Sequence, residues 1–553
     1  MSDQVSLTLN GRQVEVRADA TIREAAEAQG IHIPTFCHDD RLKPFASCFL
    51  CVVEVEKARG LLPACSTRVG AGMVIHTDSE EVNKSRRMAL DLLLSDHAGD
   101  CIAPCEATCP AGIDIQGYIA HIANGAFEAA VRLIKQRNPL PVICGRICPH
   151  PCESQCRRGL VDEPVAINPL KRFSAEYDLA HGPFVPRPGD GTGKRVAIVG
   201  GGPAGLSAAH FLRQAGHGVE IFEALPALGG MARYGIPRFR MPWEIMDQEI
   251  QAILDQGVTV HHNQKLGRDF SIADLKSRGY DAILLAIGAH LAKPMRVPNE
   301  EAPGVMGGVD FLRKVVLNEP VETGRRVAVI GGGDTAMDCA RVARRLGAEV
   351  TLLYRRTQKE MPALPVEQEE THEEGVEFRF LTAPVEVLLE NGRARGLKVI
   401  TMTLGEPDAS GRRRPVPLEG SEEELPFDLI IAAIGQDPDL SCIDRESEKP
   451  QTTRWQTFVY DEKTQITSMP GVFAAGDCAF GPDILIRAVG EGRRAAMAMD
   501  LYLRGANITL KEPYAISRGR LESLQAADFA PRFVHKKRAL ESTLPPEKRL
   551  SNE

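Results

Sequence analysis

The sequence predicts a multidomain protein: a small α+β unit of the β-grasp type, a small helical unit rich in cysteine, and an α/β region of two dinucleotide-binding units. Three observations predict this fold class. A hairpin pattern and then a helix pattern begin the chain. Of the 14 cysteines, 11 lie between Cys37 and Cys156. The segment RVAIVGGGPAGLSAAHFLRQAGHGVEIFE at Arg195 has a gapless counterpart at Arg326, 131 residues later.

Composition narrows the function classes. The net charge of −8 gives no reason to expect nucleic-acid binding. No apolar run approaches the roughly 18 residues that a membrane helix needs, and the first residues lack the layout of a signal peptide. We therefore expect no membrane insertion and a cytoplasmic location. Because a cytosol keeps thiols reduced, the clustered cysteines are more readily explained as metal ligands than as disulfides.

Residues 1–80 predict the β-grasp unit. Val5, Leu7 and Leu9 alternate with polar residues before Asn10-Gly11, a pair typical of a tight hairpin turn. A capping box then predicts a helix that begins after Thr21, and Gly30 predicts its end.

Residues 81–180 predict the helical unit. EEVNKSRRMALDLLLSD, IDIQGYIAHIA and AFEAAVRLIKQ have helical periodicity, and groups of cysteines lie between and after them. The Pro- and Gly-rich stretch 181–194 is expected to be a linker. The charged tail 511–553 is expected either to wrap the domain that precedes it or to dock a partner.

The first copy of the repeat predicts a dinucleotide site. Gly200, Gly202 and Gly205 lie between a strand and a helix, where glycines let the backbone approach a pyrophosphate. Glu223 ends the next strand, where a carboxylate can bind ribose hydroxyls. This copy suits the ADP half of FAD.

The second copy carries Gly331, Gly333 and Ala336, and Tyr354 replaces the acid. Arg355 and Arg356 follow, and two guanidiniums can pair with a 2′-phosphate, which favours NADPH over NADH. The alternative is that both arginines belong to a solvated surface patch.

A third element supports the flavin. After a short strand, Gly476-Asp477 precedes a helix that is expected to begin near Ile484. The carboxylate can bind a ribityl chain, and the helix N-terminus can face the flavin. The alternative is one more ordinary βα unit. We expect the FAD-binding unit to comprise 194–310 and 427–510, with the NAD(P)H-binding unit at 311–426.

Several motifs carry a family resemblance: CPAGIDIQGYI, CGRICPHPCESQC, GGMARYGIPRFRMP, YRRTQKEMPA and AAGDCAFGPD, together with the two Gly-rich turns. From about Cys101 to Leu503 the chain resembles the small subunit of glutamate synthase, the N-terminal part of dihydropyrimidine dehydrogenase and the large subunit of bifurcating ferredoxin:NADP transhydrogenase. The resemblance implies FAD in the outer unit, NADPH in the inserted unit and two [4Fe–4S] clusters in the helical unit. It adds Gly230 to the cofactor-binding residues, and 281–288 and 428–435 resemble the strands that cross between the units.

The first cysteine group is Cys37, Cys48, Cys51 and Cys65. Four thiolates suit a [2Fe–2S] cluster or a structural zinc, although zinc ribbons usually offer two CxxC pairs and this group has one. Residues 1–80 resemble the [2Fe–2S] ferredoxin-like domain of the electron-input subunits of respiratory complex I and iron hydrogenases. The usual Gly-x-Cys-Arg is here Ala46-Ser47-Cys48-Phe49, a mild departure.

The second set has seven cysteines, one fewer than two four-iron clusters need: Cys101, Cys105, Cys109, Cys144, Cys148, Cys152 and Cys156. By the family's interleaved pattern, one cluster takes Cys101, Cys105 and Cys156, and the other takes Cys109, Cys148 and Cys152. Cys144 could complete the second. The family's Gln or Glu ligand aligns with Lys171, whose ammonium is no ligand. His97 could complete the first, as a similarly placed His does in the complex I subunit.

These features predict an NAD(P)H:acceptor oxidoreductase. No side chain is assigned a catalytic role, because hydride passes from the nicotinamide to the flavin and the protein holds the two rings together. We expect electrons to pass from NADPH to FAD, to the [4Fe–4S] pair, to the [2Fe–2S] cluster and to a partner redox subunit or ferredoxin, or the reverse, within a hetero-oligomer.

Three alternatives remain open. The chain could be the small subunit of a glutamate synthase, which needs a large partner. It could be a stand-alone flavin disulfide reductase, although residues 190–553 contain no CxxC pair and Cys339, Cys442 and Cys478 stand alone. A cluster scaffold without enzymatic activity is least favoured, since two nucleotide sites are intact.

Overall fold

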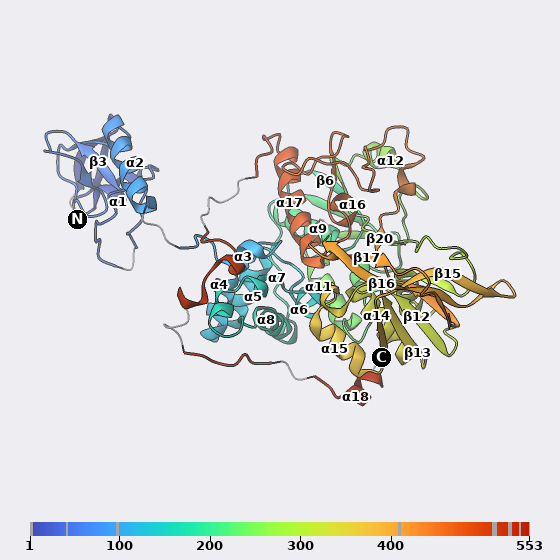
Figure 1. Ribbon diagram of the computed structural model, residues 1–553. Coiled ribbons are helices and arrows are strands. Elements are labelled where there is room, and N and C mark those ends of the chain that lie inside the picture. Colours follow the sequence, from blue (N-terminus) through green and yellow to red (C-terminus); the bar gives the residue numbers. More distant parts are fainter. Residues whose placement is uncertain are drawn as a thin grey trace. The chain divides into compact units, whose positions relative to one another are not determined.

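The computed structural model describes residues 4–39, 42–95, 99–407, 411–510, 517–528, 534–540 and 543–551. The chain forms two compact units, Met1–Asp100 and Cys101–Glu553, and each is described by itself (Figure 1).

The first unit is built on a five-stranded sheet with the order β2-β1-β5-β3-β4. Its strands are β1 (Gln4–Leu9), β2 (Arg12–Arg17), β3 (Val52–Val55), β4 (Leu62–Pro63) and β5 (Val74–His76). The first two strands are antiparallel, and β5 runs parallel to β1. The turn between β1 and β2 has positive φ at Asn10 (47°) and Gly11 (79°), as a tight hairpin requires. Helix α1 (Ile22–Ala28) begins at the expected capping box of Thr21 and Glu24. The hairpin and helix predictions are confirmed.

Helix α2 (Glu80–Ser95) belongs to this first unit as well. Val82 is fully buried, and Arg86 Nη2 donates a hydrogen bond to the carbonyl of Val52 on β3 (2.8 Å). The compact unit therefore extends to Asp100, beyond the expected boundary at residue 80.

The second unit begins with a layer of short helices. They are α3 (Pro104–Thr108), α4 (Ile115–Ala123), α5 (Phe127–Lys135), α6 (Pro141–Ile147), α7 (Pro151–Ser154), the 3-10 helix η1 (Arg157–Leu160) and α8 (Ile167–His181). Helices α4, α5 and α6 pack on α8, and the phenol of Tyr118, fully buried, donates to the carbonyl of Ile167. The expected helical unit is present, with cysteines at or near the ends of α3, α6 and α7.

A five-stranded parallel sheet with the order β21-β9-β6-β7-β8 follows. Its elements are β6 (Arg195–Val199), α9 (Pro203–Gln214), β7 (Gly218–Phe222), α10 (Met231–Tyr234), α11 (Trp243–Leu254), β8 (Thr259–His261), α12 (Ile272–Ser277), β9 (Ala282–Leu285), β21 (Val472–Ala474), α16 (Asp477–Phe480) and α17 (Leu485–Leu503). Helices α9 and α17 pack against each other (Figure 1). The strand order places the Gly-rich turn after β6 at the carboxyl edge, where such sheets bind ligands.

The inserted part has its own parallel sheet with the order β11-β19-β12-β13-β14. Its elements are β11 (Val305–Gly307), α13 (Gly308–Val316), β12 (Arg326–Ile330), α14 (Asp334–Arg345), β13 (Glu349–Tyr354), η2 (Gln358–Glu360), α15 (Pro365–Glu373), β14 (Glu377–Phe380) and β19 (Leu429–Ala432). The antiparallel strands β15 (Thr382–Glu390), β16 (Arg393–Pro407), β17 (Arg413–Pro417) and β18 (Glu423–Pro426) lie between β14 and β19.

The expected insertion limits of 311 and 426 are too narrow. Strands β11 and β19 pair with each other, and β19 pairs with β12, so both belong to the second sheet. The short antiparallel strands β10 (Leu291–Ala292) and β20 (Gln436–Asp437) join the two nucleotide units. Sequence periodicity missed this boundary because β9 and β19 are equally apolar runs after which the chain crosses between the units.

The described parts of the C-terminal segment lie along the helical layer and reach the inserted unit. Arg157 donates to the carbonyl of Gly519, and Arg538 forms an ion pair with Glu153 (2.6 Å). Helix α18 (Pro546–Leu550) contacts α15 through an ion pair of Arg549 with Glu373 (Figure 1). Among the described helices, none is both long and apolar enough to cross a membrane.

Candidate redox site

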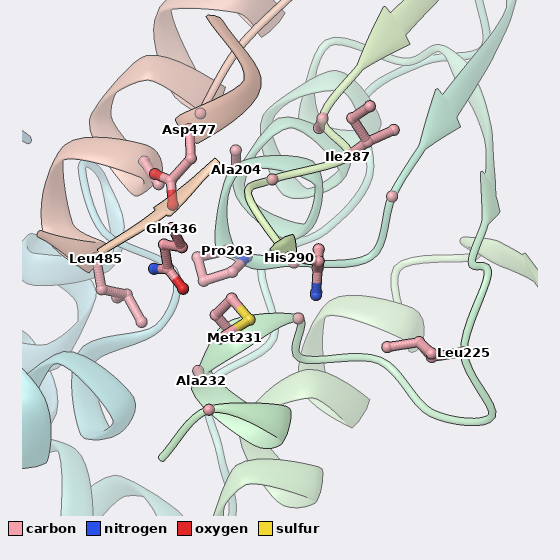
Figure 2. Close-up of a pocket in the computed structure, with 18 of the residues that line it drawn as sticks. Pro203, Ala204, Leu225, Met231, Ala232, Ile287, His290, Gln436, Asp477 and Leu485 are labelled. Atoms are coloured by element: carbon pink, nitrogen blue, oxygen red, sulfur yellow. The ribbon is translucent and has the colours of Figure 1, made fainter. Parts of the chain in front are cut away.

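A cavity of about 520 Å³ lies where the two nucleotide units and the helical layer meet. Its walls include the Gly-rich turn before α9, the N-termini of α16 and α17, and the N-terminus of α14 from the inserted unit. Figure 2 shows Pro203, Met231, His290, Gln436 and Asp477 around this common space. Residues of both nucleotide units therefore line the same cavity.

The glycines of the first Gly-rich turn, between β6 and α9, fall into two classes. A Cβ on Gly205 would lie 2.0 Å from the carbonyl oxygen of Gly200, and one on Gly200 would lie 2.3 Å from that of Ala286. The fold itself therefore demands glycine at both positions. Gly202 is different: its φ is −80°, and the nearest atom to an added Cβ is 3.6 Å away. Glycine at 202 is explained by the close approach of a ligand to the N-terminus of α9.

Glu223 stands at the end of β7, as expected, and lines the cavity. Its carboxylate accepts the N–H groups of Gly201 (2.7 Å) and Leu225 (2.8 Å), which hold it in place. Burial raises its pKa, partly offset by these hydrogen bonds. A fixed acid at this position fits the ribose of an ADP group.

Asp477 begins α16, and its carboxylate points into the cavity (Figure 2). Burial raises its pKa to about 7, and the neighbouring charge of Asp483 acts in the same direction. Gly476 has φ 77°, and Gly230, the N-cap of α10, has φ 52°, and a Cβ on Gly230 would lie 2.8 Å from the Cα of Gly202. These residues fit the ribityl and pyrophosphate parts of FAD.

The glycines of the second Gly-rich turn, between β12 and α14, fall into the same two classes. A Cβ on Gly331 would lie 2.2 Å from the carbonyl oxygen of Ala433, whereas one on Gly333 would meet nothing closer than 3.9 Å. Ala336 is fully buried under the turn. The open N-terminus of α14 fits a second dinucleotide.

The two arginines after β13 differ. Arg355 is exposed, whereas Arg356 is buried and donates from Nε to the carbonyl of Arg413 (2.7 Å). Tyr354 packs against Gly332 and donates to the carbonyl of Glu360. Arg355 is therefore the more accessible candidate for a 2′-phosphate.

Arg240 joins the two nucleotide units beside the cavity. Its guanidinium contacts Asp338 on α14 (2.8 Å) and Glu367 on α15 (2.9 Å), and Asp338 is buried. Burial raises the pKa of Asp338 to about 6, although Arg240 opposes that shift. The preceding Phe239 lies under the guanidiniums of Arg341 and Arg345. The two units are held together at this point by a buried ion-pair network.

Among the polar residues of the cavity that sequence reasoning missed are His290 and Gln436. Burial and the charge of Arg313 lower the pKa of His290 to about 4, so the ring is neutral. Gln436 Oε1 is buried and has no hydrogen-bond partner among the described residues. Both follow the strands that cross between the units, and that position was the only available signal.

The first cysteine group is held in the 36–65 region of the first unit. Cys65 interacts electrostatically with Cys51, Cys37 and Cys48, so the four thiols are neighbours. Within the described residues no three or more Cys, His, Asp or Glu side chains are grouped tightly enough for a single metal ion. Four neighbouring thiols that are not grouped tightly enough for one ion fit the two irons of a [2Fe–2S] cluster better than one zinc ion.

Four large apolar side chains are exposed on the loop that carries Cys37 and Cys48. They are Phe36, Leu42, Phe45 and Phe49, with exposed fractions of 73, 70, 80 and 57%. We call these four residues the apolar loop. Exposed apolar groups gathered in one place mark interaction surfaces more often than scattered ones do.

The cysteines of the helical layer form two groups. Cys105 interacts electrostatically with Cys156, whereas Cys109, Cys148 and Cys152 line a small cavity of about 20 Å³. This division matches the interleaved pattern implied by the family resemblance. Cys144 is fully buried and does not line the cavity, but Lys171 does. His97 lies outside the described residues.

The two cavities are separated by very little protein. Ile147 and Pro149, on either side of Cys148, both line the large cavity. On α17, Leu485 lines the large cavity and the next residue, Ile486, lines the small one. A group in the large cavity and a cluster bound to Cys148 are thus neighbours.

Three family models match the chain. Residues 194–492 match the pyridine nucleotide-disulphide oxidoreductase model, residues 83–183 the dihydropyrimidine dehydrogenase domain II, 4Fe-4S cluster model, and residues 2–80 the 2Fe-2S iron-sulfur cluster binding domain. The matches confirm the expected order of a [2Fe–2S] domain, a four-iron domain and a flavoprotein.

Curated proteins with redox functions are similar in sequence to most of the chain. The chain is 45% identical over 428 residues to the NADP(+)-dependent formate dehydrogenase subunit beta of Moorella thermoacetica, covering 73% of this chain and 60% of that protein. It is 43% identical to the NADPH-Fe(3+) oxidoreductase subunit beta of Geobacter sulfurreducens, covering 74% and 65%. It is 34% identical to the glutamate synthase [NADPH] small chain of Azospirillum brasilense, covering 74% and 88%. The chain thus spans less than two thirds of the first two relatives, and the resemblance to the glutamate synthase small subunit is confirmed.

Proposed function

Since the chain belongs to the pyridine nucleotide-disulphide oxidoreductase family, we propose that it is the NADPH-linked electron-transfer subunit of a larger redox enzyme. Electrons pass between NADPH, FAD, two [4Fe–4S] clusters, one [2Fe–2S] cluster and a partner redox subunit or ferredoxin. A bound flavin exchanges a hydride with the nicotinamide and single electrons with clusters.

The position of Cys148 between two residues that line the large cavity carries this proposal. Ile147 and Pro149 form part of the wall of the large cavity, and Cys148 between them lines the small one. Leu485 and Ile486 repeat this relation on α17. A flavin in the large cavity and a cluster at Cys148 would share these short segments, which supports an electron relay.

The choice of NADPH rests on the end of β13. No carboxylate occupies the position of Tyr354, and Arg355 is exposed beside it. The names of two relatives, which specify NADP(+) and NADPH, support the same choice.

The partner is proposed from the extra N-terminal domain and from the relatives. Two relatives are named as beta subunits, one of a formate dehydrogenase and one of an Fe(3+) oxidoreductase. The [2Fe–2S] domain adds a further electron-transfer site beyond the four-iron clusters. We therefore infer a hetero-oligomer in which a separate subunit catalyses the other half-reaction.

Two other functions are less well supported. A glutamate synthase small subunit would not explain residues 2–80, which match a separate cluster domain. A disulfide reductase needs a thiol pair at the flavin, and residues 190–553 hold no CxxC pair. Cys442 borders the large cavity, but Cys478 is fully buried behind it.

The test is anaerobic reduction of the purified full-length holoprotein. NADPH is expected to bleach the flavin absorbance and then to produce electron paramagnetic resonance signals of reduced clusters, faster than NADH does. Flavin reduction without any cluster signal would contradict the relay. Native purification under anaerobic conditions identifies the partner; recovery as a monomer active on disulfides would favour the reductase alternative.

A further inference from the structure

Lys171 is a buried cation facing the small cavity. It projects from α8, and its exposed fraction is 6%. Within the described residues its ammonium makes no hydrogen bond or ion pair, and the other lining groups include Cys109, Cys148 and Cys152. An unpaired ammonium in a dry site costs several kcal/mol, so the cavity calls for an anionic occupant.

A second polar group at the cavity is also without a partner. Asn168 lies one helical turn before Lys171, and its Oδ1 is buried with no hydrogen-bond partner in the described residues. Its Nδ2 donates to the carbonyl of Gly145, which fixes the amide. Lys171 and Asn168 thus present one polar face of α8 to the three thiols.

Cys144 is the remaining cysteine of this region, and it interacts electrostatically with Lys171 and Cys148. It sits one turn before Cys148 on α6, is fully buried and does not line the cavity. Its sulfur is 3.7 Å from Asn138 Oδ1, and the neighbouring N–H of Ile143 is bound by the Glu249 carboxylate (2.9 Å). Glu249 therefore anchors the backbone beside Cys144, and the thiol of Cys144 is directed to Asn138 rather than lining the cavity.

We propose that the second four-iron cluster is attached by three cysteines only, Cys109, Cys148 and Cys152, that Lys171 lies beside its fourth iron, and that Cys144 is not a ligand. This inference depends on one part of the proposed function, namely that the chain binds iron–sulfur clusters. Replacing a thiolate by a neighbouring cation makes the cluster environment less negative, which favours the reduced state.

A fourth iron without a thiolate is also the iron most easily lost. On treatment with ferricyanide, the cluster gives one electron to the oxidant and releases one Fe²⁺, so that [4Fe–4S]²⁺ becomes [3Fe–4S]⁺. This conversion is a direct signature of three-cysteine ligation and does not involve NADPH.

The experiment uses full-length protein with its flavin, purified anaerobically, in the variants Cys144→Ala, Cys148→Ala, Lys171→Met and Lys171→Cys. For each variant we measure the iron content, the electron paramagnetic resonance spectrum and the cluster midpoint potentials. An unchanged flavin absorbance spectrum serves as the check that the variant is folded. We expect Cys144→Ala to keep its iron, Cys148→Ala to lose about four irons per chain, Lys171→Met to keep the cluster at a lower potential, and Lys171→Cys to resist conversion to [3Fe–4S].

Loss of about four irons in Cys144→Ala, with flavin retained, would overturn the proposal. Cys144→Ser serves as the second variant if the alanine variant does not fold. An unchanged potential in Lys171→Met, or no [3Fe–4S] signal from the wild type, would also overturn it. Failure of the proposed function has a different signature: intact clusters that NADPH does not reduce.

Discussion

At the scale of single residues, the middle glycines of the two Gly-rich turns indicate ligand binding, because the fold itself does not require glycine at these positions. Gly202 and Gly333 both have negative φ and room for a methyl group, while their neighbours Gly205 and Gly331 have none. A requirement for glycine that the protein does not impose comes from what binds there.

We predict that Gly202→Ala folds but binds FAD at least tenfold more weakly, because the methyl group occupies the path of the pyrophosphate. Gly333→Ala is the matched variant, and it should retain FAD and lose NADPH affinity. Flavin content and equilibrium titration with NADPH check both. Loss of both cofactors in either variant would contradict the assignment of one site to each copy.

Asp477 predicts a pH dependence. Its pKa in the folded protein is about 7, above the ordinary value, so the folded chain holds a proton that the unfolded chain releases. The stability of the flavin-free protein should therefore fall as pH rises from about 4 through 7. We expect Asp477→Asn to raise the melting temperature by a few degrees at pH 8, with the gain vanishing near pH 4.

The control for Asp477 is Asp255→Asn, which makes the same charge change at an exposed site. A pH-independent gain in Asp477→Asn, or an equal gain in the control, would contradict the pKa shift as its cause. FAD binding should weaken in Asp477→Asn alone.

At the scale of elements, helix α2 shows where a family boundary and a folding boundary differ. The cluster-domain match ends at residue 80, but the compact unit ends at Asp100, with Val82 buried and Arg86 bonded to β3. We predict that a fragment of residues 1–100 melts several degrees above a fragment of residues 1–80. Thermal melting followed by circular dichroism checks this; equal melting temperatures would mean that α2 adds nothing to the fold.

Arg240 predicts coupling between the nucleotide units. In Arg240→Ala the buried Asp338 loses its cation, and breaking such a pair costs about 3–5 kcal/mol. We expect a lower melting temperature and slower flavin reduction by NADPH, measured by stopped-flow absorbance. Arg238→Ala removes an exposed guanidinium paired with Glu244 and should change neither the melting temperature nor the rate of flavin reduction. Equal effects of the two variants would contradict a special role of Arg240.

The sequence predicts elements well where a local signal exists. The capping box at Thr21, the hairpin turn at Asn10 and the Gly-rich turns all specify backbone geometry within a few residues. The insertion boundary, the Arg240 network and Gln436 depend on pairing between segments about 100 to 150 residues apart, which no local pattern encodes. Lys171 was recognised by position, but only the cavity shows that it faces the three thiols.

At the scale of the whole molecule, the C-terminal segment connects parts of the second unit that are far apart in sequence. Arg538 pairs with the buried Glu153 beside Cys152, and Arg549 reaches Glu373 on α15. The segment contacts the helical layer and the inserted unit; the expectation that it wraps the flavin domain does not describe these contacts.

We predict that deleting residues 534–553 speeds the loss of cluster absorbance in air several-fold, because Glu153 loses its cation and the helical layer loses its cover. Deleting residues 543–553 alone keeps Arg538 and should leave the rate near that of the full chain. Visible absorbance after exposure to air measures both. Equal rates in the two deletions would place the effect in α18.

The apolar loop has a practical consequence for handling this protein. Three phenylalanines and a leucine held in water on one segment are a site for self-association, and salts such as sulfate strengthen apolar contacts. Crystallisation from high sulfate would select packing through this loop, and light scattering of the isolated first unit should rise with sulfate concentration. Phe45→Lys would lower that rise without touching a cysteine.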